Sequence, residues 1–168
     1  MTPSFVSFPN PVNEVTARVV AGGVVLLALA AIVLQQPWLS VVLAGGFLLR
    51  VLSGPRFSPL ALLASRVIVP RLPVAPKLVA GPPKRFAQAI GVVFSVTAAV
   101  LAVGFGLTTA AYAVLGVLTV FATLESVFGI CLGCRAFALL MRLGVIPVEV
   151  CERCNDIWAD RGPVAPAP

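Results

Sequence analysis

Long apolar runs, separated by short polar or proline-bearing segments, dominate the chain. Residues 15–34 are almost wholly Val, Ala, Leu and Ile. About 20 such residues cross the roughly 30 Å hydrocarbon core of a bilayer as a helix. Further apolar runs that predict spans, the first of them short for a crossing, lie at 39–53, 85–103 and 108–130. The pattern therefore predicts four transmembrane helices.

Shorter amphipathic segments follow the second and fourth spans. After the second span, Leu60, Leu63 and Val67 recur at helical spacing, and Arg66 and Arg71 flank them. This arrangement is typical of a helix that lies in the membrane interface. The segments expected to do so are 59–70 and 135–143.

The first helix is expected to start at Asn10-Pro11, because Asn can cap the free backbone N–H groups and Pro at the first helical position loses no needed donor. Residues 1–10 carry no basic residue, so no signal peptide is expected and the first span should be retained.

The two halves of the chain follow one plan. A shift of 75 residues places Arg50 on Glu125, Gly54 on Gly129 and Ala61 on Ala136. Because each half holds an even number of spans, the copies should be parallel. The expected fold is an all-α integral membrane protein with two parallel hairpin repeats, each followed by a short interfacial helix. Its expected parts are a tail at 1–9, a four-helix membrane domain at 10–144 (repeats at about 10–71 and 81–144, loop at 72–80) and a C-terminal tail at 145–168.

Composition agrees with a membrane location. The chain is 60% hydrophobic and only 11% charged, with a mean hydropathy of +1.06, whereas soluble domains are about one quarter charged. Seven of the twelve basic residues lie between Arg50 and Arg85, a stretch without acids. They predict a cytoplasmic loop in contact with anionic lipid, with both termini also cytoplasmic. Nucleic acid is not expected as a partner, because the charges alternate with Pro, Leu and Val and no aromatic ladder for stacking bases accompanies them.

Four cysteines supply the most specific motif. Cys131 and Cys134 form one CxxC pair, Cys151 and Cys154 form a second, and the chain has no histidine. The spacing C-x2-C-x16-C-x2-C falls in the range of a Cys₄ zinc site, in which two CxxC loops complete a tetrahedron. The sequence thus allows a structural zinc ion held by all four cysteines.

A redox use of the thiols competes with zinc. Cys134 falls where a short helix begins, and a helix N-terminus lowers the pKa of a neighbouring thiol. In many CxxC sites, however, the first cysteine is the exposed one, which favours Cys131 as the attacking thiol. Two such pairs could pass electrons or sulfane sulfur, and the simplest alternative is a set of structural thiols.

Glu125 and Arg50 are the ionisable residues inside the predicted spans that call for partners. An acid in a membrane helix is costly, so it usually has a partner or a function. Their matching repeat positions favour an Arg50–Glu125 ion pair, with Glu125 as an acid or base for the thiols as the second interpretation. Hydroxyl residues in the spans are few and scattered, so a small-molecule transporter is only a third hypothesis.

Four motifs occur in a fixed order: FPNPVNE at 8–14, GPRFSP at 54–59, GPPKRFAQ at 81–88 and CLGC at 131–134. They resemble an uncharacterised bacterial family of small multi-pass membrane proteins, domain of unknown function 4395. The resemblance implies a bacterial plasma (inner) membrane protein and supplies no activity. Its association with thioredoxin-like and sulfurtransferase neighbours implies such a cytoplasmic partner and thiol or sulfur chemistry.

The functional hypothesis is a membrane-anchored thiol or sulfur-handling component, redox or sulfur relay, that works at the cytoplasmic face through Cys131 and Cys134. The alternative is a non-enzymatic membrane scaffold clamped by a Cys₄ zinc site. The sequence leaves open whether the protein is an enzyme.

Overall fold

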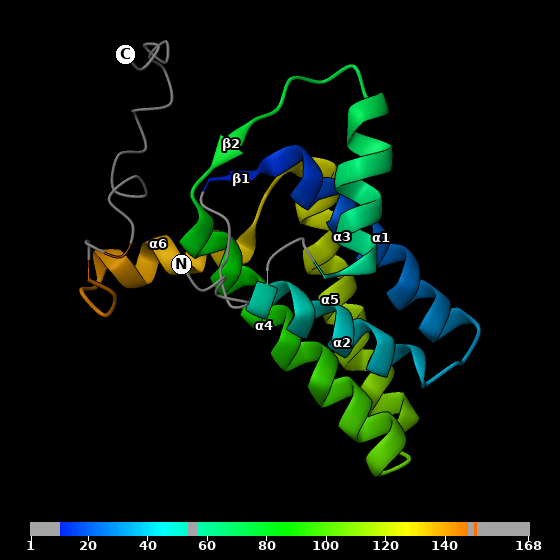
Figure 1. Cartoon of the computed structure of the whole chain (residues 1–168). Coiled ribbons are helices and arrows are strands. Elements are labelled where there is room, and N and C mark those ends of the chain that lie inside the picture. The colour runs from blue at the N-terminus through cyan, green and yellow to red at the C-terminus, as the bar shows by residue number, and fades with distance from the viewer. Residues whose placement is uncertain (1–10, 54–56, 148–149, 151–168) are drawn as a thin grey trace, which may run out of the picture.

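The computed structural model describes residues 11–53, 57–147 and 150. Helices make up most of this part, and the fold is all-α, as the sequence predicted (Figure 1). The main helices are α1 (Glu14–Val33), α2 (Leu39–Ser53), α3 (Pro59–Leu63), α4 (Gly81–Ala99), α5 (Thr108–Phe128) and α6 (Leu132–Arg142). A π-helical turn (Ala64–Ile68) and a 3₁₀ turn (Val69–Arg71) continue α3, and a second π-helical turn (Val100–Gly104) continues α4. Two two-residue strands, β1 (Val12–Asn13) and β2 (Leu78–Val79), complete the fold.

In the part of the chain that the structure describes, three helices are long and apolar enough to cross a membrane. They are α1, α4 with its π-helical continuation, and α5. The apolar helix α2 has 15 residues, a length of about 22 Å at 1.5 Å per residue, and so is shorter than the hydrocarbon core. Large apolar side chains cover the outside of these helices, as Leu26, Val93 and Val120 illustrate, each more than half exposed. An exterior of this kind is typical of a protein surrounded by lipid.

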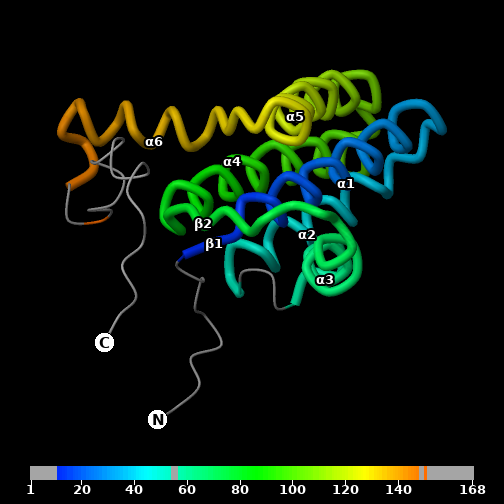
Figure 2. The backbone as a smooth tube through the Cα atoms, turned by 90° about the horizontal axis from the view of Figure 1, so that it is seen from above, coloured from blue at the N-terminus to red at the C-terminus, as the bar shows by residue number. Residues whose placement is uncertain are grey.

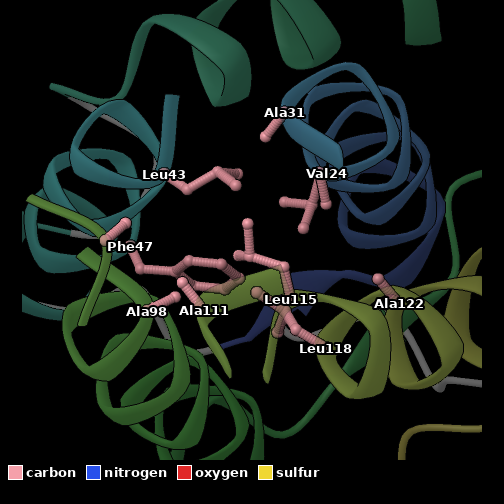
Figure 3. Packing of buried hydrophobic residues seen from close by; sticks show 11 residues of the cluster. Val24, Ala31, Leu43, Phe47, Ala98, Ala111, Leu115, Leu118 and Ala122 are labelled. Atoms are coloured by element: carbon pink, nitrogen blue, oxygen red, sulfur yellow. The ribbon is translucent and has the colours of Figure 1, made fainter. Parts of the chain in front are cut away.

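The helices pack in pairs that are distant in sequence, α1 against α5 and α2 against α4. Between them lies a core of buried Ala, Val, Leu and Phe side chains (Figure 3). Small residues allow the close approach, which is a common device in membrane helix packing. At Gly91 in α4 an added Cβ would lie 2.2 Å from a ring carbon of Phe47 in α2. Glycine at 91 is therefore required by the α2–α4 contact.

The first helix starts later than the sequence predicted. Its first residue is Glu14, and the side chain of Asn13, not Asn10, caps it by accepting a hydrogen bond from the Val15 N–H at 3.0 Å. The reason is tertiary, because Val12 and Asn13 pair with Val79 and Leu78 as an antiparallel ladder. Asn10 lies outside the described residues. The start of α1 is thus tied to the end of the central loop.

A salt bridge strengthens this tie. The Glu14 N–H donates to the Lys77 carbonyl at 2.7 Å, and the Lys77 Nζ lies 2.9 Å from the Glu14 carboxylate. The carboxylate also sits in the first turn of α1, where it complements the helix dipole. The ladder and the salt bridge together hold the loop against the end of the bundle from which α4 starts.

The two short amphipathic helices exist, with shifted bounds. The segment expected at 59–70 is α3 with its continuation, and it packs on α1, where Leu60 covers Gly23. The segment expected at 135–143 is α6, which begins three residues earlier, at Leu132. It leaves the end of α5 and lies along α4 (Figure 2), burying Phe137 and Met141.

Candidate thiol site

A tight turn between α5 and α6 positions the first cysteine. Gly129 ends α5 in the left-handed conformation, with φ of 68°. Its N–H donates to the Glu125 carbonyl at 3.1 Å, and the Ile130 N–H donates to the Leu124 carbonyl at 3.1 Å. This is the glycine-based cap that commonly ends helices. It turns the chain so that Cys131 becomes the N-cap residue of α6.

Arg18 of α1 holds the same helix end from the side. Its Nε donates to the Ser126 carbonyl at 3.1 Å and its Nη2 to the Val127 carbonyl at 2.8 Å. These carbonyls have no partners within the helix, and a cation near a helix C-terminus also complements the dipole. The turn that carries Cys131 is therefore anchored to α1.

The two cysteines of CLGC lie in direct contact. Their Sγ atoms are 2.8 Å apart, and both are free thiols. The Sγ of Cys131 also accepts a hydrogen bond from the backbone N–H of Cys134 at 3.4 Å, as an N-cap side chain does. The intervening Gly133 lets α6 approach α4, since an added Cβ would lie 2.6 Å from the Ala87 Cα. The spacing of the motif thus serves both the thiol contact and the helix contact.

The contact makes the two thiols chemically different. The hydrogen bond from the Cys134 thiol lowers the pKa of Cys131, and the positive charge of Lys84 acts in the same direction. The same hydrogen bond raises the pKa of Cys134, because it is the donor, and burial raises it further. Cys131 is therefore the thiol that ionises first, which makes it the stronger candidate for nucleophilic attack.

Glu125 pairs with a residue that the sequence analysis did not single out. The Nζ of Lys84 lies 2.7 Å from Oε1 of Glu125, and the two side chains are 8% and 21% exposed. The expected partner, Arg50, makes no salt bridge with Glu125 in the part of the chain that the structure describes. The reason is geometric, because the first turn of α4 brings Lys84 to the carboxylate. The signal was present in GPPKRFAQ, whose Lys84 was counted only as a topology charge.

Arg50 is nevertheless close to this pair. It is 3% exposed, its guanidinium carbon lies 4.3 Å from the centre of the Phe47 ring, and it is attracted electrostatically by Glu125. Its Nε has no hydrogen-bond partner. Arg50 thus lies in the region that the sequence indicated, and in this structure the salt bridge of Glu125 is to Lys84.

These groups line one cavity of about 430 Å³ between the helices. Its charged and thiol-bearing walls come from Arg50 of α2, Lys84 of α4, Glu125 of α5 and Cys131 at the start of α6. A volume of this size lies in the range of small-molecule sites. The cavity therefore joins the Cys131 thiol to charged groups from three other helices.

The predicted zinc site falls partly outside the described residues, because Cys151 and Cys154 lie there. Within the described ranges, no group of three or more His, Cys, Asp or Glu residues could hold a metal ion. Cys131 and Cys134 by themselves supply two of the four ligands that a structural zinc ion takes. The zinc interpretation stays a prediction.

Comparison with known proteins identifies a family to which no function is assigned. The family model described as domain of unknown function (DUF4395) matches residues 12–142. This range includes Cys131, Cys134 and the charged cavity residues, and ends before Cys151. No curated protein and no solved structure matches the chain. The chain belongs to the DUF4395 family of uncharacterised domains.

Proposed function

We propose that this protein is a membrane-embedded thiol or sulfur-handling component that works through Cys131 and Cys134. The observation that carries the proposal is the thiol contact of 2.8 Å at the N-cap of α6, with Cys131 on the wall of a cavity. In this contact the pKa of Cys131 is lowered and the pKa of Cys134 is raised. Exchange chemistry requires one ionised thiol and one protonated neighbour, whereas purely structural thiols do not need to differ in this way.

The exchange would run in two balanced steps. The Cys131 thiolate attacks one sulfur of a substrate disulfide, the substrate S–S bond breaks, and the released thiolate takes a proton. Cys134 then loses its proton and attacks the Cys131 sulfur, which releases the second substrate thiol and leaves a Cys131–Cys134 disulfide. The substrate gains two electrons, and a dithiol reductant of the thioredoxin-like kind restores the pair. With a persulfide donor, the Cys131 thiolate would instead attack the outer sulfur. The donor S–S bond would break, the donor would leave as a thiolate that takes a proton, and Cys131 would carry the sulfane sulfur as a persulfide.

The proposed roles of the charged neighbours follow from their placement. Lys84 stabilises the Cys131 thiolate through its positive charge. Glu125, in contact with Lys84 at 2.7 Å, keeps that ammonium group oriented and is the candidate acid or base for the proton released by Cys134.

We also propose that four spans form two parallel hairpin repeats, with both termini and the basic loop cytoplasmic in the plasma membrane. The packing supports a two-fold relation that exchanges α1 with α4, α2 with α5, and α3 with α6. Applied to the contact of α1 with α5, this exchange gives the contact of α4 with α2. Applied to the contact of α1 with α3, it gives the contact of α4 with α6. All four contacts are present in the structure. The short α2 would then cross a locally thinned region of the bilayer.

Labelling tests the topology. A single cysteine at Leu78, in a chain whose native cysteines are serine, should resist an impermeant thiol reagent added to intact cells and react after the cells are opened. Labelling of position 78 from outside intact cells would contradict the proposed orientation.

Single cysteine variants test the thiol function. In a full chain with Cys151 and Cys154 changed to serine, dithiodipyridine, whose thiol product absorbs light, should release two thiols per protein as Cys131 and Cys134 form a disulfide. Cys134→Ser should release one thiol and retain a mixed disulfide that mass spectrometry detects. Cys131→Ser should react more slowly, since burial still raises the pKa of the remaining Cys134 thiol.

Metal analysis of the unmodified chain separates this proposal from the zinc scaffold. The thiol proposal expects no bound zinc and reactive thiols after purification without added metal. One tightly bound zinc per chain, lost equally in each of the four Cys→Ser variants, would replace it with the structural site. Equal reactivity of Cys131→Ser and Cys134→Ser would also contradict the assigned roles.

A further inference from the structure

The cavity beside Cys131 carries an uncompensated positive charge. Its charged lining residues, within the described chain, are Arg50, Lys84 and Glu125. The Glu125 carboxylate is engaged by Lys84 at 2.7 Å, so among the described residues the charge of Arg50 has no ion-pair partner of its own. A charge buried without a partner is costly. The wall is therefore complementary to an anionic group.

Helix packing sets the depth at which Arg50 lies. Phe47 of α2 packs on Gly91 of the antiparallel α4, and Arg85 Nε donates to the Val51 carbonyl at 3.1 Å. This register places Arg50 level with Gln88, because each lies one turn beyond the Phe47–Gly91 contact in the same direction. Lys84 is one further turn, about 5.4 Å, toward the end of the bundle that carries Cys131. A ligand held at Arg50 would thus extend along the cavity toward the thiol.

Two buried polar atoms at this depth are unsatisfied. Arg50 Nε and Gln88 Oε1 have no hydrogen-bond partner within the described ranges, although the great majority of buried polar groups have one. Both residues line the cavity. The guanidinium also rests on the Phe47 ring at 4.3 Å, which limits its movement and leaves its planar group available to a carboxylate.

We propose that the cavity binds small disulfides or thiols that carry a carboxylate, with Arg50 as the residue that recognises the carboxylate. This deepens the proposed thiol function and rests on it. With the carboxylate at Arg50, the sulfur should lie near Lys84, one helical turn closer to Cys131. An arm of about two carbons between the carboxylate and the sulfur matches this offset. A bare inorganic anion would leave most of the 430 Å³ empty.

Three disulfides with the same two-carbon arms test the proposal: dithiodipropionate ends in carboxylates, cystamine in ammonium groups and bis(hydroxyethyl) disulfide in hydroxyls. Binding is measured by calorimetry in detergent on a full chain whose four cysteines are serine, so that no exchange occurs. Dithiodipropionate should bind at least about tenfold more tightly than the hydroxyl analogue, and cystamine least tightly, since a hydrogen bond to a charged group contributes about one tenfold step or more.

Variants identify the residue responsible. Arg50→Gln should abolish the preference for dithiodipropionate, and Arg50→Lys should keep part of it. Arg66→Gln, the same change at an exposed arginine outside the cavity lining, should leave the preference intact. If Arg50→Gln unfolds, initial exchange rates of the three disulfides with the chain carrying native Cys131 and Cys134 provide the same comparison.

The outcomes separate this inference from the thiol function. Equal binding and equal exchange rates of the three disulfides would overturn carboxylate recognition while leaving exchange itself in place. A preference that survives in Arg50→Gln would overturn the assignment to Arg50. Selective binding of dithiodipropionate by a protein whose native cysteines do not exchange would support the site and contradict the proposed function.

Discussion

Removing the partner of Glu125 should destabilise the protein measurably. Lys84→Met keeps the length of the side chain and removes its charge, which leaves the carboxylate without the ammonium group at 2.7 Å. Breaking a buried ion pair costs about 3–5 kcal/mol. Because Glu125 is 21% exposed, water recovers part of this, and we expect about 2–3 kcal/mol.

A double-mutant cycle isolates the pair. The assay is thermal unfolding in detergent of Lys84→Met, Glu125→Gln and the double variant. For a chain of this size, a loss of about 1 kcal/mol in unfolding free energy lowers Tm by about 2–4 °C, so each single change should lower Tm by roughly 4–12 °C. The double variant should be more stable than additivity predicts, with a coupling free energy of about 1–3 kcal/mol. The matched cycle with Arg50→Met and Glu125→Gln should give a smaller coupling, because Arg50 attracts Glu125 without a salt bridge.

Two results would refute this reasoning. Strict additivity of Lys84→Met and Glu125→Gln would mean that the two side chains do not interact in the folded protein. A larger coupling for Arg50 than for Lys84 would mean that Glu125 pairs across the repeats, as the sequence alone suggested.

Three further predictions concern the cysteine turn. Gly133→Ala should lower Tm and slow thiol exchange, because its Cβ would lie 2.6 Å from the α4 backbone. Gly116→Ala is the control, since an added Cβ there meets nothing within 4 Å, and it should change neither Tm nor the exchange rate. Equal effects of the two changes would contradict the close contact of α6 with α4. Because the pKa of Cys131 is lowered, its alkylation by iodoacetamide should persist to lower pH than that of an ordinary thiol. Lys84→Met should raise the pH at which the alkylation rate is half its maximum. An unchanged midpoint would mean that Lys84 does not act on the thiol. Arg18→Met should destabilise the chain by about 1.5–3 kcal/mol, since charged hydrogen bonds to the last turn of α5 are lost, and an unchanged Tm would contradict that anchor.

Local pattern determined much of the architecture. The apolar runs predicted the four longest described helices, and runs of about 20 residues are also long enough to cross a membrane whatever their neighbours are, whereas α2 with 15 residues is shorter. The αL cap at Gly129 and the helix that starts beside CLGC are likewise local, since a glycine and an N-cap act within a few residues of themselves. The importance of the region around Glu125 was visible for the same reason, because an acid in an apolar run is costly wherever it lies.

Only the tertiary structure decided which groups meet. Asn13 rather than Asn10 starts α1 because residues 12–13 pair with 78–79, a contact between segments about 65 positions apart. Glu125 binds Lys84 rather than Arg50 because the packing of α4 against α5 brings the first turn of α4 to the carboxylate. The cavity that joins Arg50 to Cys131 is lined by residues from all six α-helices of the described chain. Hydropathy assigns each segment to the membrane but carries no information on rotation about the helix axis, and in lipid that rotation is set by side-chain packing between helices.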